Sequence, residues 1–339
     1  MPAPLTDLDT LGRPMHDLRI SVTDRCNFRC VYCMPKEVFG RDHAFLPRAE
    51  ILTFEEVERV VRAAVALGVC KVRLTGGEPL VRRNLETLVA MLAAIEGIDD
   101  LTLTTNASLL ADRAQLLADA GLHRVTVSLD ALDDSTFQAM NDVGFPVSRV
   151  LDGIDAAETA GLGPIKVNAV IRRGLNEHAV LELAERFRRT STTVRFIEYM
   201  DVGHTNGWRL DDVVPAAEVI ASIDARWSLQ PISADYRGEV AQRYRYRDGG
   251  GEIGVISSVT QPFCGDCTRA RLTADGQLFT CLFATSGHDL RALVRSGASD
   301  PDLAEAVRVI WAGRDDRYSE LRTLDTVDLP RVEMSFIGG

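Results

Sequence analysis

In the stretch Lys71-Val72-Arg73-Leu74-Thr75, apolar and polar side chains alternate. Successive side chains of a β-strand point to opposite faces, so Val72 and Leu74 share one face while Lys71, Arg73 and Thr75 share the other. A parallel strand that helices cover on both sides is expected to be apolar on both faces. Two cations and a hydroxyl on one face therefore favour a barrel-like sheet with a polar lumen, although an edge strand facing water would also alternate.

The same alternation recurs at 165–169 and 194–198, which strengthens the lumen interpretation. Apolar, β-rich runs alternate with amphipathic stretches through the first two-thirds of the chain. The runs predict strands at 18–22, 69–75, 100–104, 124–129, 165–171 and 193–199, and the stretches predict helices at 53–67, 84–95, 108–120, 147–160 and 176–189. Thr53, Asn84, Ser108 and Asn176 are candidate N-caps of these helices. Regular repetition with short connections implies a parallel sheet, either doubly wound or curled. The polar faces favour an α/β fold with an incomplete (β/α)6 TIM-like barrel over residues 1–225.

The pattern changes after Met200. A Gly- and Asp-rich loop at 201–212 precedes a predicted helix at 215–225, and the next segments are short and closely spaced. They predict strands at 241–247, 252–257, 269–272 and 277–280, with hairpin turns at Asp248-Gly249 and Asp275-Gly276. The segment 289–313 is predicted to be helical. Residues 226–339 are therefore expected to form a C-terminal antiparallel β and helical extension.

Length and charge restrict the classes of function. A chain of 339 residues can hold one large α/β domain with an extension, or two domains. The formal net charge of −11 argues against a general nucleic-acid or membrane-surface binder, whose footprint would be basic. Any anionic ligand must therefore meet a local group of cations. Neither a leader-like N-terminus nor a run of about eighteen apolar residues is visible, so the expected compartment is the cytoplasm.

Three of the seven cysteines, Cys26, Cys30 and Cys33, lie within eight residues. Thiolates spaced C-x3-C-x2-C can face one centre when the chain wraps around it, and iron–sulfur clusters are held by such loops. Three protein ligands on a four-iron cluster would leave one iron open to a small molecule. Zinc binding and chance clustering of small apolar residues remain alternatives.

A second triplet, Cys264, Cys267 and Cys281, lies in the predicted extension. Its spacing fits an iron–sulfur cluster and a zinc site equally well, and His288 is the nearest candidate for a fourth zinc ligand. The seventh cysteine, Cys70, is expected to be a small buried residue at a strand start.

Small polar groups follow three of the predicted strands. They are Thr75-Gly76-Gly77-Glu78-Pro79, Thr104-Thr105-Asn106 and Ser128-Leu129-Asp130. Loops after parallel strands are where α/β active sites assemble, and paired glycines let a backbone approach a ligand closely. Each motif alone is also compatible with an ordinary turn or helix cap.

With its aromatic Tyr32 before the last cysteine, the first triplet resembles the cluster loop of the radical S-adenosylmethionine superfamily, and 76–79 matches that superfamily's second motif. The resemblance narrows to the GTP 3',8-cyclase family of molybdenum cofactor biosynthesis over nearly the whole chain. The segments that carry it are 18–26, 194–200, 254–267, Arg269-Ala270-Arg271, Cys281 and the tail Gly338-Gly339. Two departures are Ala107, where the family usually has glycine, and Asn141-Asp142-Val143, where a Gly-Arg pair is common.

The resemblance implies a role for each matching residue. Cys26, Cys30 and Cys33 would hold a [4Fe-4S] cluster whose open iron binds S-adenosylmethionine, with Tyr32, Gly77, Ser128 and Met200 lining that site. Cys264, Cys267 and Cys281 would hold a second [4Fe-4S] cluster that binds the guanine of GTP. The substrate contacts would be Arg19, Lys71, Arg73, Thr104, Lys166, Arg195, Arg269 and Arg271, and the residues implied in catalysis are Arg269, Arg271, Gly338 and Gly339.

The implied reaction is that of a lyase. S-adenosylmethionine is split into methionine and a 5'-deoxyadenosyl radical, which removes the 3' hydrogen of GTP. The ribose radical adds to C8 of guanine and, after one reduction, gives 3',8-cyclo-7,8-dihydro-GTP. The implied partners are an electron donor and a downstream cyclic pyranopterin synthase, with no nucleic acid and no membrane, and the chain is expected to be a monomer or homodimer. Alternatives are a radical enzyme that modifies a peptide, a non-catalytic iron–sulfur redox protein and a zinc-stabilised binding module.

Overall fold

The computed structural model describes residues 7–322 and 331–338. A single mixed sheet runs through it, with the strand order β12-β11-β10-β1-β2-β3-β4-β5-β6-β9-β8-β7. The six central strands are neighbours in chain order, and all pair in parallel. They are β1 (Asp17–Ser21), β2 (Lys71–Thr75), β3 (Asp100–Thr105), β4 (Arg124–Ser128), β5 (Lys166–Ile171) and β6 (Thr193–Glu198), which confirms the six strands predicted from the sequence.

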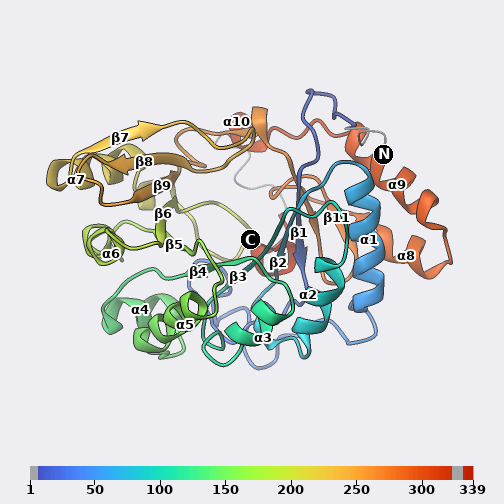
Figure 1. The fold of residues 1–339 in the computed structure, drawn as a ribbon, viewed down its shortest axis with the longest axis horizontal. Coiled ribbons are helices and arrows are strands. Elements are labelled where there is room, and N and C mark those ends of the chain that lie inside the picture. Colours follow the sequence, from blue (N-terminus) through green and yellow to red (C-terminus); the bar gives the residue numbers. More distant parts are fainter. Residues whose placement is uncertain (1–6, 323–330, 339) are drawn as a thin grey trace.

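Helices surround this parallel core on its outer side (Figure 1). They are α1 (Phe54–Ala66), α2 (Leu85–Ala93), α3 (Ala114–Asp119), α4 (Asp134–Asn141), α5 (Val147–Thr159), α6 (Ala179–Phe187) and α7 (Ala216–Arg226). The prediction omitted α4, and α3 and α6 begin later than predicted. Thr53 caps α1 through a capping box, as expected. Asn84 is the N-cap residue of α2, as predicted, but its side chain makes no cap bond. Ser108 and Asn176 are not caps, because α3 begins at Ala114 and α6 at Ala179.

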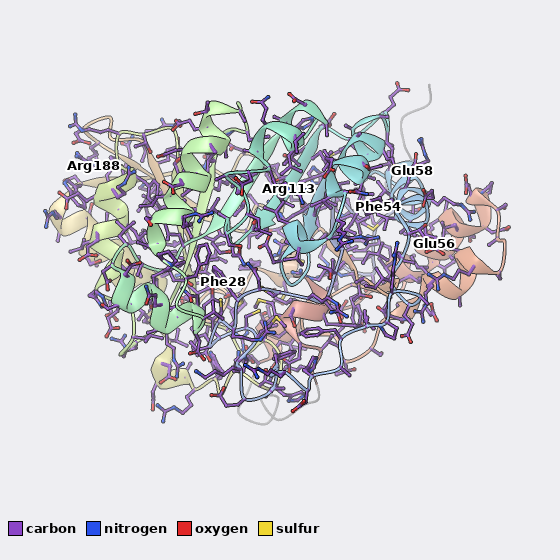
Figure 2. All side chains as sticks on the ribbon, turned by 90° about the horizontal axis from the view of Figure 1, so that it is seen from below. Phe28, Phe54, Glu56, Glu58, Arg113 and Arg188 are labelled. Carbon is purple, nitrogen blue, oxygen red and sulfur yellow. The ribbon has the colours of Figure 1, made fainter. Side chains whose placement is uncertain are left out.

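The hydrophobic core lies between the sheet and these helices. Val72 and Leu74 are fully buried there, in one cluster with Val57 and Val61 of α1. Phe28, between Cys26 and Cys30, belongs to the same cluster and lies near the middle of the molecule (Figure 2). The apolar face that the alternation in β2 predicted therefore packs against helices, and the first cysteine loop is anchored in the core.

The C-terminal strands extend this sheet at both edges. They are β7 (Leu229–Ile232), β8 (Gln242–Tyr246), β9 (Glu252–Ile256), β10 (Arg269–Leu272), β11 (Gln277–Phe279) and β12 (His288–Asp289). The predicted hairpins are confirmed, since β8 pairs antiparallel with β9 and β10 with β11. However, β9 is parallel to β6 and β10 is parallel to β1, so the extension is not purely antiparallel. The Asp-Gly turn residues predict only that the two strands beside them pair with each other. They do not indicate which distant strand pairs with the hairpin. The domain boundary near 225 stays a prediction.

The remaining helices follow the sheet. They are α8 (Leu290–Arg295), α9 (Asp300–Ala312), α10 (Tyr318–Leu321) and α11 (Met334–Ile337), with single 3-10 turns at Pro79–Val81, Leu210–Asp212 and Cys264–Asp266. The predicted helical segment 289–313 is thus two helices. In the part of the chain that the structure describes, no helix combines the length and apolar character needed to cross a membrane.

Candidate active site

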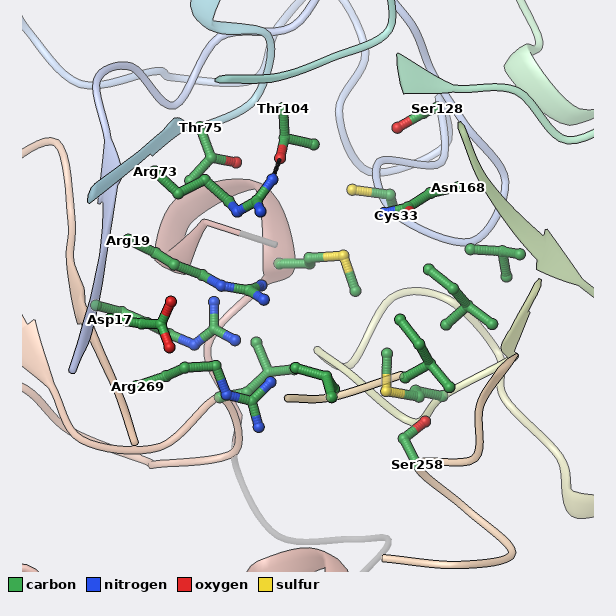
Figure 3. A pocket seen from close by; sticks show the side chains of 18 of the residues that line it. Asp17, Arg19, Cys33, Arg73, Thr75, Thr104, Ser128, Asn168, Ser258 and Arg269 are labelled. Atoms are coloured by element: carbon green, nitrogen blue, oxygen red, sulfur yellow. Dashed lines mark hydrogen bonds between the residues drawn. The ribbon is translucent and has the colours of Figure 1, made fainter. Parts of the chain in front are cut away.

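All six parallel strands contribute to one pocket of about 280 Å³. It lies on the face of the sheet opposite Val72 and Leu74, which pack against α1, and side chains that line it are drawn in Figure 3. Lys71, Arg73 and Thr75 of β2 line it, as the alternation predicted. The pocket brings together every predicted site residue of the described chain except Gly338. These are Arg19, Cys26, Cys30, Tyr32, Cys33, Lys71, Arg73, Gly77, Thr104, Ser128, Lys166, Arg195, Met200, Cys264, Cys267, Arg269, Arg271 and Cys281.

The glycine pair after β2 supports the first cysteine loop. A Cβ atom at Gly77 would lie 2.3 Å from the carbonyl oxygen of Arg25, and one at Gly76, where φ is +145°, would lie 2.4 Å from the carbonyl oxygen of Thr23. The Gly77 amide donates to Thr23 and the Glu78 amide donates to Arg25, both at 2.8 Å. The two glycines therefore let the backbone hold the chain that leads into Cys26.

The Glu78 side chain ties the end of β2 to the end of β3. Its carboxylate accepts hydrogen bonds from the Thr105 hydroxyl at 2.7 Å, the Asn106 amide at 2.7 Å and the Leu80 amide at 3.0 Å. Burial raises the pKa of Glu78 to about 7, although these hydrogen bonds act in the opposite direction. The sequence indicates Glu78 only as part of its motif and not as a site residue, because the partners Thr105 and Asn106 come from a different strand.

The three cysteines of the first triplet are free and half-buried in the pocket wall. Burial raises the pKa of Cys26 to about 12 and those of Cys30 and Cys33 well above their usual value. Such thiols hold their protons until a metal ion displaces them, as a coordinating metal does. The Phe28 amide already points at the Cys26 sulfur, at 3.4 Å. This donor set fits an iron–sulfur cluster.

The second triplet lines the same pocket from the C-terminal strands. Burial opposes ionisation of Cys267, but Arg269 and Arg314 outweigh it and lower its pKa to about 6. Arg269 donates a hydrogen bond to the Cys267 sulfur at 3.3 Å. His288, the candidate fourth zinc ligand, is exposed in β12 and is not part of the pocket wall.

No three His, Cys, Asp or Glu side chains within 7–322 and 331–338 lie close enough together to hold a single metal ion. Cys70 is also outside the pocket lining, with its sulfur 3.1 Å from Nε2 of His16. It is half-buried, so the expectation of a buried residue is only partly met.

On the side of the first triplet, Tyr32 is held by a carboxylate. Its hydroxyl donates to Asp130 Oδ2 at 2.8 Å, and Asp130 Oδ1 accepts from the Val170 amide at 2.9 Å. Burial raises the pKa of Asp130 to about 6. The predicted cofactor-site residues Ser128 and Met200 line the adjoining wall. Asp130 is thus a pocket residue that the sequence indicated only by its place after a strand.

Cations form the other side of the pocket, where the guanidinium groups of Arg19, Arg73 and Arg269 point inward (Figure 3). Arg73 is buried, and Arg19 and Arg269 are half-buried. Arg73 donates to the Thr104 hydroxyl at 2.8 Å and to the Thr126 hydroxyl at 3.0 Å. Neutral hydroxyls orient a guanidinium group without balancing its charge. Nε of Arg269 is buried and has no hydrogen-bond partner among the residues that the structure describes.

These neighbouring cations repel one another, and each disfavours the charged form of the others. Burial, with neighbouring guanidinium groups, lowers the pKa values of Arg19 and Arg73 to about 9, that of Arg195 to about 10 and that of Lys166 to about 7. Lys71 is better compensated, since its Nζ lies 3.5 Å from Asp17 and 2.6 Å from the Tyr236 hydroxyl. An anionic ligand would relieve the repulsion, so the pocket suits a polyanion.

The C-terminal tail reaches this region. Arg271 donates a hydrogen bond to the carbonyl oxygen of Gly338, which is buried at φ +80°. A Cβ atom there would lie 2.7 Å from Cγ2 of Thr75. Gly339 lies outside the described residues. Gly338 thus contacts two pocket residues, although it does not itself line the pocket.

The two departures from the family pattern lie beside the first cysteine loop. Ala107 is fully buried and takes the left-handed conformation, with φ +59°, that glycine usually provides. In the second departure, the carbonyl oxygen of Asn141 accepts from the Arg29 amide at 3.0 Å. The chain therefore keeps a glycine-like turn with alanine, and uses the end of α4 to hold the cysteine loop.

Comparison with known proteins agrees with this arrangement. Residues 20–187 match the family model of the Radical SAM superfamily, and residues 192–320 match that of Molybdenum Cofactor Synthesis C. The GTP 3',8-cyclase of Acidothermus cellulolyticus is 61% identical over 322 residues, which cover 94% of this chain and 89% of that protein. The GTP 3',8-cyclase of Staphylococcus aureus strain MRSA252 is 49% identical over 335 residues, which cover 98% of both chains.

Among solved structures, Streptococcus suis SuiB bound to its precursor peptide SuiA superposes with a TM-score of 0.62 at 15% identity, over 93% of this chain and 68% of that one. The structure of SuiB bound to S-adenosylmethionine gives a TM-score of 0.61 at 16% identity, over 93% and 72%. At this identity the likeness concerns the fold alone, which is the radical S-adenosylmethionine α/β fold. The two cyclases are 61% and 49% identical to this chain over nearly its whole length, so the chain belongs to the GTP 3',8-cyclase family.

Proposed function

We propose that the chain converts GTP to 3',8-cyclo-7,8-dihydro-GTP, the first step of molybdenum cofactor biosynthesis. The observation that carries this proposal is one shared pocket, which has a cysteine triplet at each of two places in its wall and buried or half-buried cations beside them. One triplet would serve the radical chemistry and the other would hold the substrate base. The cations would bind the triphosphate.

At the first triplet, Cys26, Cys30 and Cys33 would hold a [4Fe-4S] cluster. When bound, this cluster and S-adenosylmethionine supply a 5'-deoxyadenosyl radical that can remove the 3' hydrogen of GTP. Tyr32, oriented by its hydrogen bond to Asp130, would contact S-adenosylmethionine. Gly77, Ser128 and Met200 would complete that binding site.

At the second triplet, Cys264, Cys267 and Cys281 would hold a further [4Fe-4S] cluster that binds guanine. The triphosphate would lie against Lys71, Arg73, Lys166 and Arg195, with Arg19 and Thr104 beside them. Guanidinium groups suit this role because they offer paired donors to phosphate oxygens and keep their charge. Arg269 and Arg271, together with Gly338 and Gly339, would orient the reacting ribose and base.

The architecture suits a radical reaction. We propose that β1 to β6 curl into an incomplete TIM-like barrel, which is supported by the presence of all six strands in one pocket wall. Residues 1–225 would form this core and residues 226–339 the extension with the second cluster. A surrounding wall excludes water and fixes the substrate hydrogen against the radical. The partners would be an electron donor and a cyclic pyranopterin synthase that consumes the product, and the chain would act as a monomer or homodimer.

A direct test is anaerobic reconstitution, followed by incubation with dithionite, S-adenosylmethionine and GTP. We expect about eight iron atoms per chain, for two four-iron clusters, 5'-deoxyadenosine, and a nucleotide product with the mass of GTP. Cys33→Ala should abolish formation of 5'-deoxyadenosine, whereas Cys281→Ala should retain some of it and lose the cyclic product. Formation of 5'-deoxyadenosine by the parent protein without a GTP-derived product would refute the cyclase assignment.

A further inference from the structure

Three charged side chains behind the second triplet are almost completely buried and paired with one another. Nε of Arg13 lies 2.6 Å from Oδ2 of Asp9, and a terminal nitrogen of Arg314 lies 3.0 Å from the same oxygen. The exposed fractions of the Asp9, Arg13 and Arg314 side chains are 0%, 0% and 1%. We call these residues the Asp9–Arg13–Arg314 triad.

The triad holds the backbone of every segment that carries a cysteine of the second triplet. Arg13 donates to the carbonyl oxygen of Cys264 at 2.7 Å, and Arg314 donates to that of Cys267 at 2.7 Å. Arg314 also donates to the carbonyl oxygen of Thr280, the residue before Cys281, at 3.0 Å. Two guanidinium groups thus fix three backbone segments relative to one another.

The rest of the environment reinforces this geometry. The Trp311 indole donates to the carbonyl oxygen of Arg13 at 3.0 Å, and its ring packs 4.6 Å from the Arg314 guanidinium carbon. Arg314 itself lines the pocket. The triad therefore joins the start of the chain, the segment after α9 and the cysteine segments, although Asp9 and Arg314 are 305 residues apart in sequence.

Burying three charges is costly, and fold stability alone does not explain their retention, because apolar residues of similar volume often stabilise as well or better. The triad has two positive charges and one negative charge, and the Asp316 carboxylate lies 3.5 Å from Nε of Arg314, so each guanidinium charge has a carboxylate nearby and removal of any one charge changes the field at the cluster. Thiolates on an iron–sulfur cluster are anionic, and reduction makes the cluster more negative. A fixed positive charge nearby favours the reduced state, since net charge is one determinant of cluster potential.

We propose that the Asp9–Arg13–Arg314 triad positions the second iron–sulfur cluster and sets its reduction potential. The inference rests on the proposed function, because it requires a cluster at Cys264, Cys267 and Cys281. The hydrogen bonds that Arg13 and Arg314 donate to the cysteine segments go to backbone carbonyl oxygens and not to sulfur atoms. The three residues act through the backbone and through their charge, so they are positioning residues.

The potential provides a test that separates this role from general stability. In a full-length parent that lacks Cys26, Cys30 and Cys33, only the second cluster can assemble. Arg314→Gln removes a positive charge and should lower the midpoint potential of that cluster, whereas Asp9→Asn removes a negative charge and should raise it. Arg314→Lys, which keeps the charge but offers fewer directed donors, should keep the potential closer to that of the parent than Arg314→Gln does.

The matched control is Arg237→Gln. Arg237 pairs with Asp266, in the same cysteine turn, at 3.0 Å, but both side chains are largely exposed, at 54% and 66%. This variant should match the parent in iron content, electron paramagnetic resonance spectrum and midpoint potential. Exposed ion pairs contribute little to stability, so a difference between Arg237→Gln and Arg314→Gln reports the effect of the buried triad.

A second parent protein shows whether a variant loses iron only because it unfolds. In a chain that lacks Cys264, Cys267 and Cys281, Arg314→Gln should leave the iron content of the first cluster unchanged. Loss of iron from the second cluster alone supports positioning, and opposite potential shifts support the role of charge. Unchanged iron, spectra and potentials in both Arg314→Gln and Asp9→Asn would overturn the inference. If the parent with only the second triplet binds no iron, the second cluster of the proposed function fails as well.

Discussion

Lys166 is a pocket cation whose charge the folded protein disfavours. Burial, together with Arg195 and Arg124, lowers its pKa to about 7. A triphosphate favours the protonated amine, so binding at pH 8 should take up a proton, and affinity for GTP should fall by up to about tenfold per pH unit above pH 7. Below pH 7 the amine is already charged and this dependence should flatten.

Calorimetry of GTP binding at pH 8, in two buffers with different ionisation enthalpies, measures this proton uptake. Lys166→Met should abolish the uptake and weaken binding, and Glu182→Gln on the outer helix α6 serves as a control. Equal binding enthalpies in the two buffers for the parent protein would contradict the assignment.

The contact between Ala107 and Gly153 should make position 153 intolerant of a larger side chain. A Cβ atom at Gly153 would lie 3.0 Å from the carbonyl oxygen of Ala107 and 3.3 Å from its Cβ. Overpacking of this kind costs about 1–3 kcal/mol, so Gly153→Ala should lower the denaturant midpoint. Adding Ala107→Gly should restore part of the loss, while the exposed Asp152→Ala should have little effect. A Gly153→Ala variant as stable as its parent would refute this account of the turn.

The pocket cations could be predicted from sequence, because strand alternation is local and fixes which side chains share a face. The alternation within their own strands was enough to predict that Arg73 and Lys166 lie on the polar face, where both line the pocket. Glu78, Asp130 and Tyr236 were not predicted as site residues, because each depends on a partner from another element. Only the resemblance, and not any pattern, implied a role for Gly338 at the site.

At the scale of elements, the loop after β2 should decide whether the first cluster assembles. Gly77→Ala would place a Cβ atom 2.3 Å from the carbonyl oxygen of Arg25, so the chain before Cys26 must move. We expect iron to fall from about eight to about four atoms per chain, with loss of 5'-deoxyadenosine. Gly163→Ala is the control, since its nearest neighbour would be 4.0 Å away. Full iron content in Gly77→Ala would show that the loop does not depend on this close approach.

The C-terminal tail should matter for cyclisation and not for cluster assembly. Removal of Gly338 and Gly339 eliminates the acceptor of the Arg271 hydrogen bond. Because misplacement of a positioning group can cost about 100-fold in rate, we expect at least that loss of cyclic product, with both clusters retained. Product analysis by liquid chromatography, with iron counts alongside, measures both. Unchanged turnover in the truncated chain would rule out a role for the tail.

The elements themselves could be predicted to different degrees. The six strands and the hairpins followed from apolar runs and Asp-Gly turns, because these signals are local. A predicted helix cap was wrong where the polar side chain has another partner. The Asn176 side-chain amide donates to the carbonyl oxygens of Asp130 and Val170, and so joins the end of β4 to β5. The parallel pairing of β9 with β6 and of β10 with β1 joins segments too distant for any local signal.

In the whole molecule, the C-terminal strands bring the second triplet to the pocket of the parallel core. Because β10 pairs with β1, Arg269 and Arg271 lie in register with Asp17 and Arg19. This pairing places the cations of the extension beside those of the core and near both sets of cysteines. The cysteine spacings alone left two separate candidate metal sites, and the resemblance implied that both serve one substrate. The structure places both triplets in the wall of one pocket.

The central claim is that this pocket holds the ribose of GTP against a 5'-deoxyadenosyl radical. The most direct measurement uses GTP deuterated at C3' and determines the mass of the 5'-deoxyadenosine formed by the reconstituted protein. The account predicts that 5'-deoxyadenosine gains one deuterium and that the cyclic nucleotide loses it. Undeuterated 5'-deoxyadenosine, together with a nucleotide that keeps its label, would contradict the account.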